Sequence, residues 1–161
     1  MLFTGSSAMK HIKYLEEEKT MLLQKERNNS TTVEVDGKVR EVECYNFQVT
    51  RESIRELDAK ICKLRHALNV FNTHTEIEEG LTIDTALIKL AQLNNELSIV
   101  RDMKSKAKES VEERYSNMYI RRVNYDLREV ENYYQDLVKE IHQLQIKLDT
   151  ANLTNTFEVD I

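Results

Sequence analysis

The last third of the chain carries the most regular hydrophobic pattern. Between Asp126 and Asn152, apolar residues recur at alternating spacings of three and four positions, which is the a and d pattern of a coiled-coil seam. The pattern predicts a helix over residues 126–152, roughly 40 Å long at 1.5 Å per residue. Such a helix cannot bury its apolar stripe alone, so another segment or another copy of the chain must cover it.

Three other segments show helical periodicity. Residues 53–72 repeat the strict seam and are the best candidate to cover the last helix. Ser53 and Thr50 are rival N-caps for this helix. Residues 9–27 and 82–113 predict two further helices, and the wide apolar face at the start of the second favours contact with two neighbours.

Short strands are predicted between and beyond the helices. The Asp36-Gly37 pair favours positive φ angles, so residues 32–44 predict a β-hairpin. Because an isolated two-stranded hairpin is marginal, we expect it to rest on a helix or on a partner chain. Residues 118–123 and 156–161 are extended in character, and we expect them to pair with each other. Residues 1–8 predict a flexible leader.

Composition supports this division. The 161 residues include no Pro, no Trp and only three Gly, which suits long helices and not a sandwich or barrel rich in turns. We therefore predict one mainly α domain, an antiparallel bundle of long helices with a coiled-coil-like core.

Two of the helix ends share a short pattern. Residues 69–73 and 152–156 both have Asn, an aliphatic residue, any residue, Asn and Thr. Asn and Thr are ordinary residues at helix ends. The match is either a weak internal echo or chance, and we favour chance.

Charge and cysteine content narrow the function classes. The net charge of −5 argues against general nucleic-acid affinity, and no run of 18 apolar residues predicts a membrane span. Cys44 and Cys62 match no disulfide framework or metal-site spacing. Cys62 follows the seam residue Ile61, so we interpret it as a packing thiol. A cytoplasmic, reduced protein is the simplest interpretation.

Catalytic motifs do not emerge from the sequence. It contains no phosphate-binding Gly-rich loop, His-Glu-x-x-His or Cys-x-x-Cys. The four histidines are scattered, and no Glu-x-x-His pair suggests a di-iron site. We expect no catalytic residue, no metal and no cofactor.

Polar and aromatic residues concentrate near the predicted helix ends. Residues 101–122 hold seven basic and four acidic residues in an otherwise acidic chain. Arginines suit phosphates, tyrosines stack on bases, and Asn or Thr can bond ribose hydroxyls. A competing interpretation places the arginines on a solvated strand face and the tyrosines in packing. The candidate ligand-binding residues are Arg114, Tyr115, Tyr119, Arg121, Arg122, Asn124, Tyr125, Asn72, Thr73, Thr75, Asn152, Thr154 and Asn155.

Five stretches carry a resemblance to known proteins, namely residues 67–75, 81–87, 114–115, 124–126 and 148–154. In these the chain resembles a family of small helical proteins of bacteria and phages, some of which bear the name septicolysin. The resemblance covers about residues 54–161 and implies an all-helical, oligomeric protein without an established activity. Two departures are Leu153, where family members often have Trp, and the hairpin, which has no clear counterpart in many members. The name septicolysin implies a haemolysin, but the sequence shows no amphipathic or apolar segment that would insert into a membrane.

Two function hypotheses follow. The first is a non-enzymatic homo-oligomer, a dimer or higher, that binds a small anionic, nucleotide-like ligand at a subunit interface. Phages make such proteins to sequester ADP-ribose-type immune signals, and the analogy rests on size and site chemistry. The alternative is a structural or interaction coiled-coil module without a ligand. An enzyme ranks third because no nucleophile or acid–base pair is legible.

Overall fold

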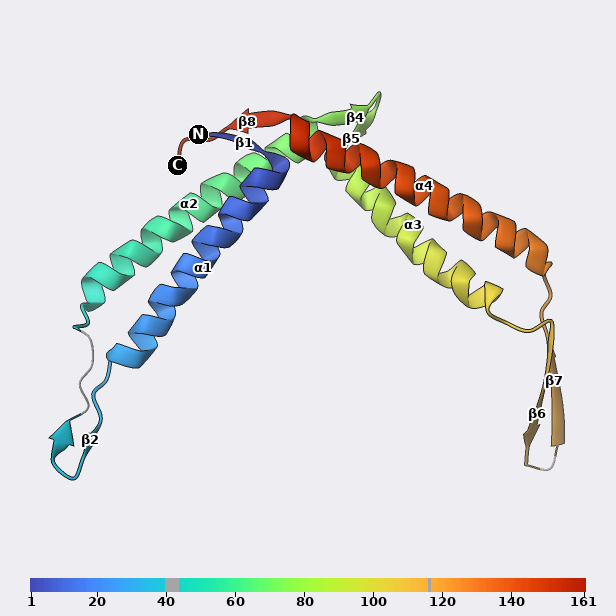
Figure 1. The fold of residues 1–161 in the computed structure, drawn as a ribbon, viewed down its shortest axis with the longest axis horizontal. Helices are drawn as coiled ribbons and strands as arrows, with labels where there is room; N and C mark the ends of the chain where they lie inside the picture. Colours follow the sequence, from blue (N-terminus) through green and yellow to red (C-terminus); the bar gives the residue numbers. More distant parts are fainter. Residues whose placement is uncertain (40–43, 116) are drawn as a thin grey trace. The chain divides into compact units, whose positions relative to one another are not determined.

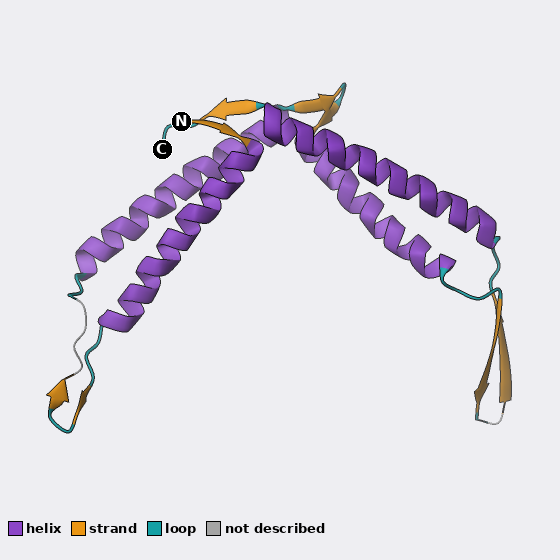
Figure 2. Ribbon diagram, in the orientation of Figure 1, coloured by secondary structure: helices purple, strands orange, loops and turns teal. Residues whose placement is uncertain are grey.

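The computed structural model describes residues 1–39, 44–115 and 117–161 (Figure 1). Helices dominate this part of the chain, and the strands form two-stranded antiparallel sheets (Figure 2). The predicted mainly α class is confirmed, whereas the bundle and its coiled-coil core stay predictions. None of the described helices has the length and apolar character needed to cross a membrane.

The chain divides into two compact units, although a single helical domain is expected from its length. Unit 1 comprises residues 1–75 and 151–161, and unit 2 comprises residues 76–150. Each unit is built around one pair of helices, and a β-hairpin connects the two helices of each pair (Figure 1).

Unit 1 is built on α1 (Gly5–Asn29) and α2 (Phe47–His74), which lie side by side (Figure 1). The seam predicted for the second helix forms one wall of the core, and Leu64 is fully buried in it. Burial of each such side chain contributes roughly 1.5–3 kcal/mol. The buried residues shared by the two helices are Ala8, Ile12, Leu15, Leu57, Ile61 and Leu64.

The first residues of the chain are part of this core. Leu2–Thr4 form β1, which pairs with β8 (Thr156–Glu158) and sets Phe3 opposite Phe157. The ring of Phe157 stacks on Phe71, with ring centroids 4.7 Å apart. The predicted flexible leader and the predicted pairing of 156–161 with 118–123 are therefore wrong, because aromatic burial holds both ends in unit 1.

Both helices of unit 1 begin earlier than the periodicity predicts. Thr4 caps α1 in a reciprocal capping box with Ser7. Asn46 caps α2, and its side-chain oxygen accepts a hydrogen bond from the Val49 amide at 3.1 Å. The helix therefore starts ahead of Ser53 and Thr50, since a polar cap sets the first turn whether or not that turn is apolar.

The predicted Asp-Gly turn is confirmed in the hairpin of unit 1. Asp36-Gly37 adopt φ angles of 53° and 75° between β2 (Glu34–Val35) and β3 (Lys38–Val39). The strands are shorter than the predicted 32–44, because Thr32, Val33 and Cys44 lie outside them. The predicted strand residues 40–43 lie outside the described residues.

Unit 2 begins with a tight hairpin. Its strands are β4 (Glu76–Glu78) and β5 (Leu81–Thr82), and Gly80 supplies the positive φ of the turn. Thr82 then caps α3 (Ile83–Lys104) in a second capping box, with Thr85. The Thr-x-x-Thr start repeats the Thr-x-x-Ser start of α1.

The seam of α4 (Leu127–Thr154) is covered by α3. Lys89 pairs with Glu140 at 2.9 Å, and Lys104 pairs with Glu131 at 2.9 Å, so the contact runs along both helices. The prediction that residues 53–72 cover this seam is wrong, because each long helix packs on the helix that precedes it across a hairpin. The buried apolar residues of the two helices include Leu93, Leu97, Val100, Leu137, Ile141 and Leu144.

The third predicted helix is too long by nine residues. α3 ends at Lys104, and the chain then forms β6 (Glu109–Arg114) and β7 (Asn117–Arg122). A helix over 105–113 would present few apolar side chains to α4, whereas a strand sets Val111 directly opposite Ile120. Cross-strand pairing therefore outcompetes helix propensity here.

The two units use equivalent positions in their second helices. Phe47 and Leu127, which begin α2 and α4, are 80 residues apart, as are His74 and Thr154, which end them. The same spacing relates three pairs of buried seam residues: Leu57 and Leu137, Ile61 and Ile141, and Leu64 and Leu144. The short sequence match pairs Asn69 with Asn152, which are 83 residues apart, so it is out of register with this spacing, in which Asn72 corresponds to Asn152.

Leu64→Ala tests the seam. We expect a loss of about 2–5 kcal/mol in the free energy of unfolding, because Leu64 is fully buried and leaves a cavity. Leu153→Ala is the matched control, because Leu153 is 63% exposed, and it should change stability by less than about 0.5 kcal/mol. Urea denaturation followed by circular dichroism measures both, and equal losses would contradict the packing described.

Candidate functional site

The structure separates the predicted site residues into two groups. Six lie in unit 1, at the ends of α2 and α4: Asn72, Thr73, Thr75, Asn152, Thr154 and Asn155. Seven lie in unit 2, on or beside the β6–β7 hairpin: Arg114, Tyr115, Tyr119, Arg121, Arg122, Asn124 and Tyr125. The predicted pocket that joins the two groups stays a prediction, and each group is described by itself.

The unit 1 group mainly terminates helices. The Thr73 hydroxyl donates to the carbonyl oxygens of Asn69 and Val70 at 3.0 and 2.9 Å, so its own helix satisfies it. A Cβ at Gly5 would collide with the side-chain oxygen of Asn152, so glycine permits close packing there. The Asn72 side-chain oxygen is buried without a hydrogen-bond partner among the described residues.

The β6–β7 hairpin has two different faces. Directly opposed residues of an antiparallel pair share a face, and successive residues alternate between faces. One face, called the apolar face, carries Val111, Met118 and Ile120. The other, called the Arg/Tyr face, carries Tyr119 and Arg121.

The two adjacent arginines therefore point to opposite sides. Arg122 lies on the same side as the apolar face and pairs with Glu109, with Nε 2.6 Å from a carboxylate oxygen. Arg121 lies on the Arg/Tyr face and pairs loosely with Glu112 at 3.6 Å. The sequence groups Arg121 with Arg122, whereas the strand geometry groups Arg121 with Tyr119.

The other members of the unit 2 group have different surroundings. Tyr125 donates its hydroxyl hydrogen to the Met103 carbonyl oxygen at 2.8 Å and so ties the base of the hairpin to α3. Tyr115 lies in the turn with a φ of 50° and is 96% exposed. Arg114 occupies the last position of β6, opposite Asn117. Tyr119 and Arg121 lie together on one surface of this hairpin.

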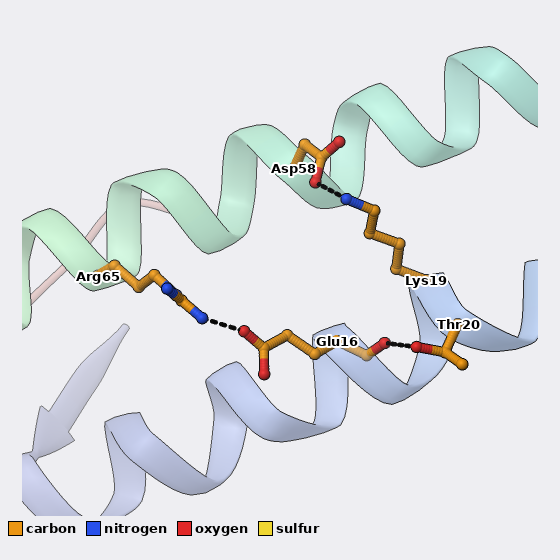
Figure 3. A network of polar contacts seen from close by, with 5 residues as sticks. All are labelled: Glu16, Lys19, Thr20, Asp58 and Arg65. Carbon is orange, nitrogen blue, oxygen red and sulfur yellow. Dashed lines mark hydrogen bonds and ion pairs between the residues drawn. The ribbon is translucent and has the colours of Figure 1, made fainter. Parts of the chain in front are cut away.

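A groove between α1 and α2 was not predicted from the sequence. It has a volume of about 710 Å³ and is crossed by two ion pairs, Lys19 with Asp58 at 2.6 Å and Arg65 with Glu16 (Figure 3). The charges are visible in the sequence, but periodicity does not show which helix faces which. The lining residues are Glu16, Lys19, Thr20, Leu23, Asp58, Ile61, Cys62, Arg65, His66 and Asn69.

Cys62 lines this groove and is exposed, so the packing-thiol prediction is wrong. Consecutive residues of an α-helix are rotated by about 100°, because one turn takes 3.6 residues. Ile61 therefore faces the core while Cys62 faces away from it.

Perturbed pKa values occur in unit 2 at Glu78, Glu131 and Tyr133. A hydrogen bond from Lys147, together with its charge, lowers the pKa of Glu78. The Tyr133 hydroxyl donates to Glu96, and this bond and the nearby carboxylate raise the pKa of Tyr133. Among the described residues, no three His, Cys, Asp or Glu side chains are grouped so as to hold a metal ion.

With two helix pairs that each carry a β-hairpin, the chain has the fold of a small, mainly helical protein. The chain belongs to a family of unknown function, DUF6847, which matches residues 43–157. It is similar in fold to a functionally unknown conserved protein from Corynebacterium diphtheriae, seen in a crystal structure. That likeness has 20% identity and a TM-score of 0.68, and covers 98% of this chain and 100% of the other. No curated protein matches the chain.

Lys147→Gln tests the contact that lowers the pKa of Glu78. We expect the pKa of Glu78 to rise toward its ordinary value, as measured by NMR titration of the side-chain carboxyl. A lowered folded-state pKa stabilises the protein above the ordinary glutamate pKa. This contribution is lost as the pH falls through the folded-state pKa, so the variant should lose less stability on acidification.

Lys139→Gln is the control for that measurement, because Lys139 pairs with Asp136 instead. It should leave the Glu78 titration unchanged. A Glu78 pKa that is insensitive to Lys147→Gln would show that another group lowers it.

Thiol labelling of the native protein tests the exposure of Cys62. We expect Cys44 and Cys62 to react with a soluble thiol reagent without denaturant, because both are exposed. Cys62→Ser should remove one reactive thiol per chain. Reaction of Cys62 only after denaturation would restore the packing interpretation.

Proposed function

We propose that the chain is a non-enzymatic protein that binds a small anionic, nucleotide-like ligand and works as a homo-oligomer, a dimer or higher. The ligand lies on the Arg/Tyr face of the β6–β7 hairpin, at an interface between copies. In this proposal the protein sequesters its ligand and does not transform it.

One observation carries the proposal: Tyr119 and Arg121 lie on the same face of the hairpin and both are accessible. Tyr119 is 53% exposed, and the Arg121 side chain is 69% exposed. They are two positions apart on β7, so their side chains leave the same side of the strand. A guanidinium beside an aromatic ring can contact a phosphate and a base of one molecule.

The ion pair at Arg121 is weak enough for a ligand to replace. Arg121 and Glu112 approach only to 3.6 Å, in an exposed setting, where such pairs contribute about 0–1 kcal/mol. A bidentate phosphate contact is charge-assisted and stronger. Stacking of a base on an aromatic side chain adds roughly 1–3 kcal/mol.

The proposed biological role follows the chemistry of this face. An ADP-ribose-like molecule offers both phosphates and a base, and a phage protein that sequesters such an immune signal would act in the host cytoplasm. The resemblance to septicolysin-named proteins adds no ligand to this proposal. In this proposal the coiled-coil-like bundle forms when copies of the helix pairs associate.

A second candidate is an interaction module without a ligand. The observation that favours it is the apolar face, where Val111, Met118 and Ile120 are 53%, 74% and 55% exposed. Such a surface suits a protein partner. Purification from the native host with a different protein in fixed stoichiometry, without any nucleotide-induced stabilisation, would favour this candidate.

Arg121→Ala tests the ligand site. In the native protein, a panel that includes ADP-ribose derivatives should contain a compound that raises the melting temperature, because binding to the folded state stabilises it by mass action. Arg121→Ala should weaken that binding at least about tenfold in calorimetry, since hydrogen bonds to charged groups contribute about 1.5–3 kcal/mol.

Arg122→Ala is the matched control, because Arg122 pairs with Glu109 on the other side of the same strand. It should leave the affinity within about a factor of two. Equal losses in the two variants would contradict the assignment of the site to one face. The absence of any stabilising nucleotide at concentrations well above ~10 μM would contradict sequestration, since binding must raise stability by mass action.

A further inference from the structure

We propose that the β6–β7 hairpins of three copies of this chain join edge to edge into a closed, six-stranded β-barrel, with the apolar faces inside. The occupant of the apolar face is therefore the same face of two other copies. The proposal specifies how the homo-oligomer assembles and needs no ligand, so its failure and the failure of the ligand proposal are separate results.

The outer edges of the hairpin are available for pairing. Within the described chain, β6 and β7 pair only with each other, over six opposed residue pairs. Each strand therefore has one edge whose amide and carbonyl groups face away from the partner strand. Six-residue edges of this kind are templates for pairing with another chain unless something covers them.

The charges of the two strands select which edges meet. β6 contains three glutamates and one arginine, which gives a net formal charge of −2. β7 contains two arginines and no acidic residue, which gives +2. Pairing β6 with β6, or β7 with β7, would bring like charges together, whereas β6 of one copy against β7 of the next is attractive.

The hairpin already shows that these two strand sequences are complementary. Inside one chain, Glu109 lies opposite Arg122 and Val111 lies opposite Ile120. The Glu109–Arg122 pair has a nitrogen–oxygen distance of 2.6 Å. Antiparallel pairing of β6 with the next copy's β7 can repeat the same combination of ionic and β-branched contacts.

An edge contact between two different strands is heterologous, so it must close into a ring or continue as a filament. Closure into a ring pairs the backbone groups of every edge strand and turns all the apolar faces toward the interior of the barrel. The middle of each face supplies only Val111 and Ile120 at directly opposed positions. Barrels of eight strands already have an interior wide enough to need filling, and these medium-sized side chains suit the smaller, six-stranded ring.

The charged residues of the apolar side lie toward the ends of such a barrel. Glu109 and Arg122 form the first opposed pair of the hairpin, beside the helices, and Glu113 lies near the turn. Val111 and Ile120 lie between them. The ends thus meet water while the middle is apolar, and Tyr119 and Arg121 face outward.

Native mass spectrometry of the full chain, with light scattering in solution, tests the ring. The native protein should have a mass of three chains or a multiple of three. Ile120→Glu should reduce that mass threefold, because three buried carboxylates would meet inside the barrel. Val111→Glu, on the other strand of the same face, should act in the same way.

Ser110→Glu is the matched control, because Ser110 lies opposite Arg121 on the outward face. It adds the same charge to the same hairpin and should leave the mass unchanged. Circular dichroism should show unchanged helix content in all three variants. A native monomer, dimer or tetramer, or a trimer that survives both apolar-face variants or dissociates in the control, would overturn the proposal.

Discussion

The burial of one apolar stripe per helix is the constraint on which the structure depends. Each unit has two helices, so each helix can cover only one face of its neighbour. In unit 1 this contact buries Leu64 completely, and in unit 2 it buries Leu137 and Leu144 almost as well. The ion pairs Lys19–Asp58 and Lys89–Glu140 lie at the margins of the seam and are partly exposed to water. The buried seam determines how the two helices of each unit pack, and the polar side chains discussed as candidate sites lie at the hairpins and on the helix surfaces.

Hydrophobic periodicity predicted where the helices are but not which of them pair. The stripes of residues 53–72 and 126–152 are equally regular, and each could cover the other. The structure pairs each with the helix before it, to which a hairpin connects it. A spacing of three and four residues identifies the buried face of a helix and carries no information on its partner.

The limits of prediction are clearest at residues 105–113. Their composition suits a helix, but Val111 gains a cross-strand partner in Ile120 only if both segments are extended. Such non-local pairing is invisible to a local pattern. The Asp36-Gly37 turn was predictable because its cause is local, the positive φ that both residues adopt.

The candidate site shows the same division between local and non-local information. Composition located the arginines and tyrosines around β7, but the alternation of side chains along the strand assigns them to faces, and the register decides which residues of β6 share each face. A shift of one residue would exchange the two faces and would place Arg122 with the neighbours of Arg121. The grouping of Tyr119 with Arg121 follows from the alternation of side chains along β7 alone. The grouping of Val111 with Ile120 rests on the register, in which these two residues are directly opposed.

The equal lengths of α2 and α4 have a consequence for how such a protein can change. The two helices are both 28 residues long, yet the hairpins before them differ, with two-residue strands in unit 1 and six-residue strands in unit 2. A hairpin at the end of a helix pair can lengthen or shorten without altering the packing of the seam. Natural selection can therefore remodel one tip while the other, and both helix pairs, keep their original form.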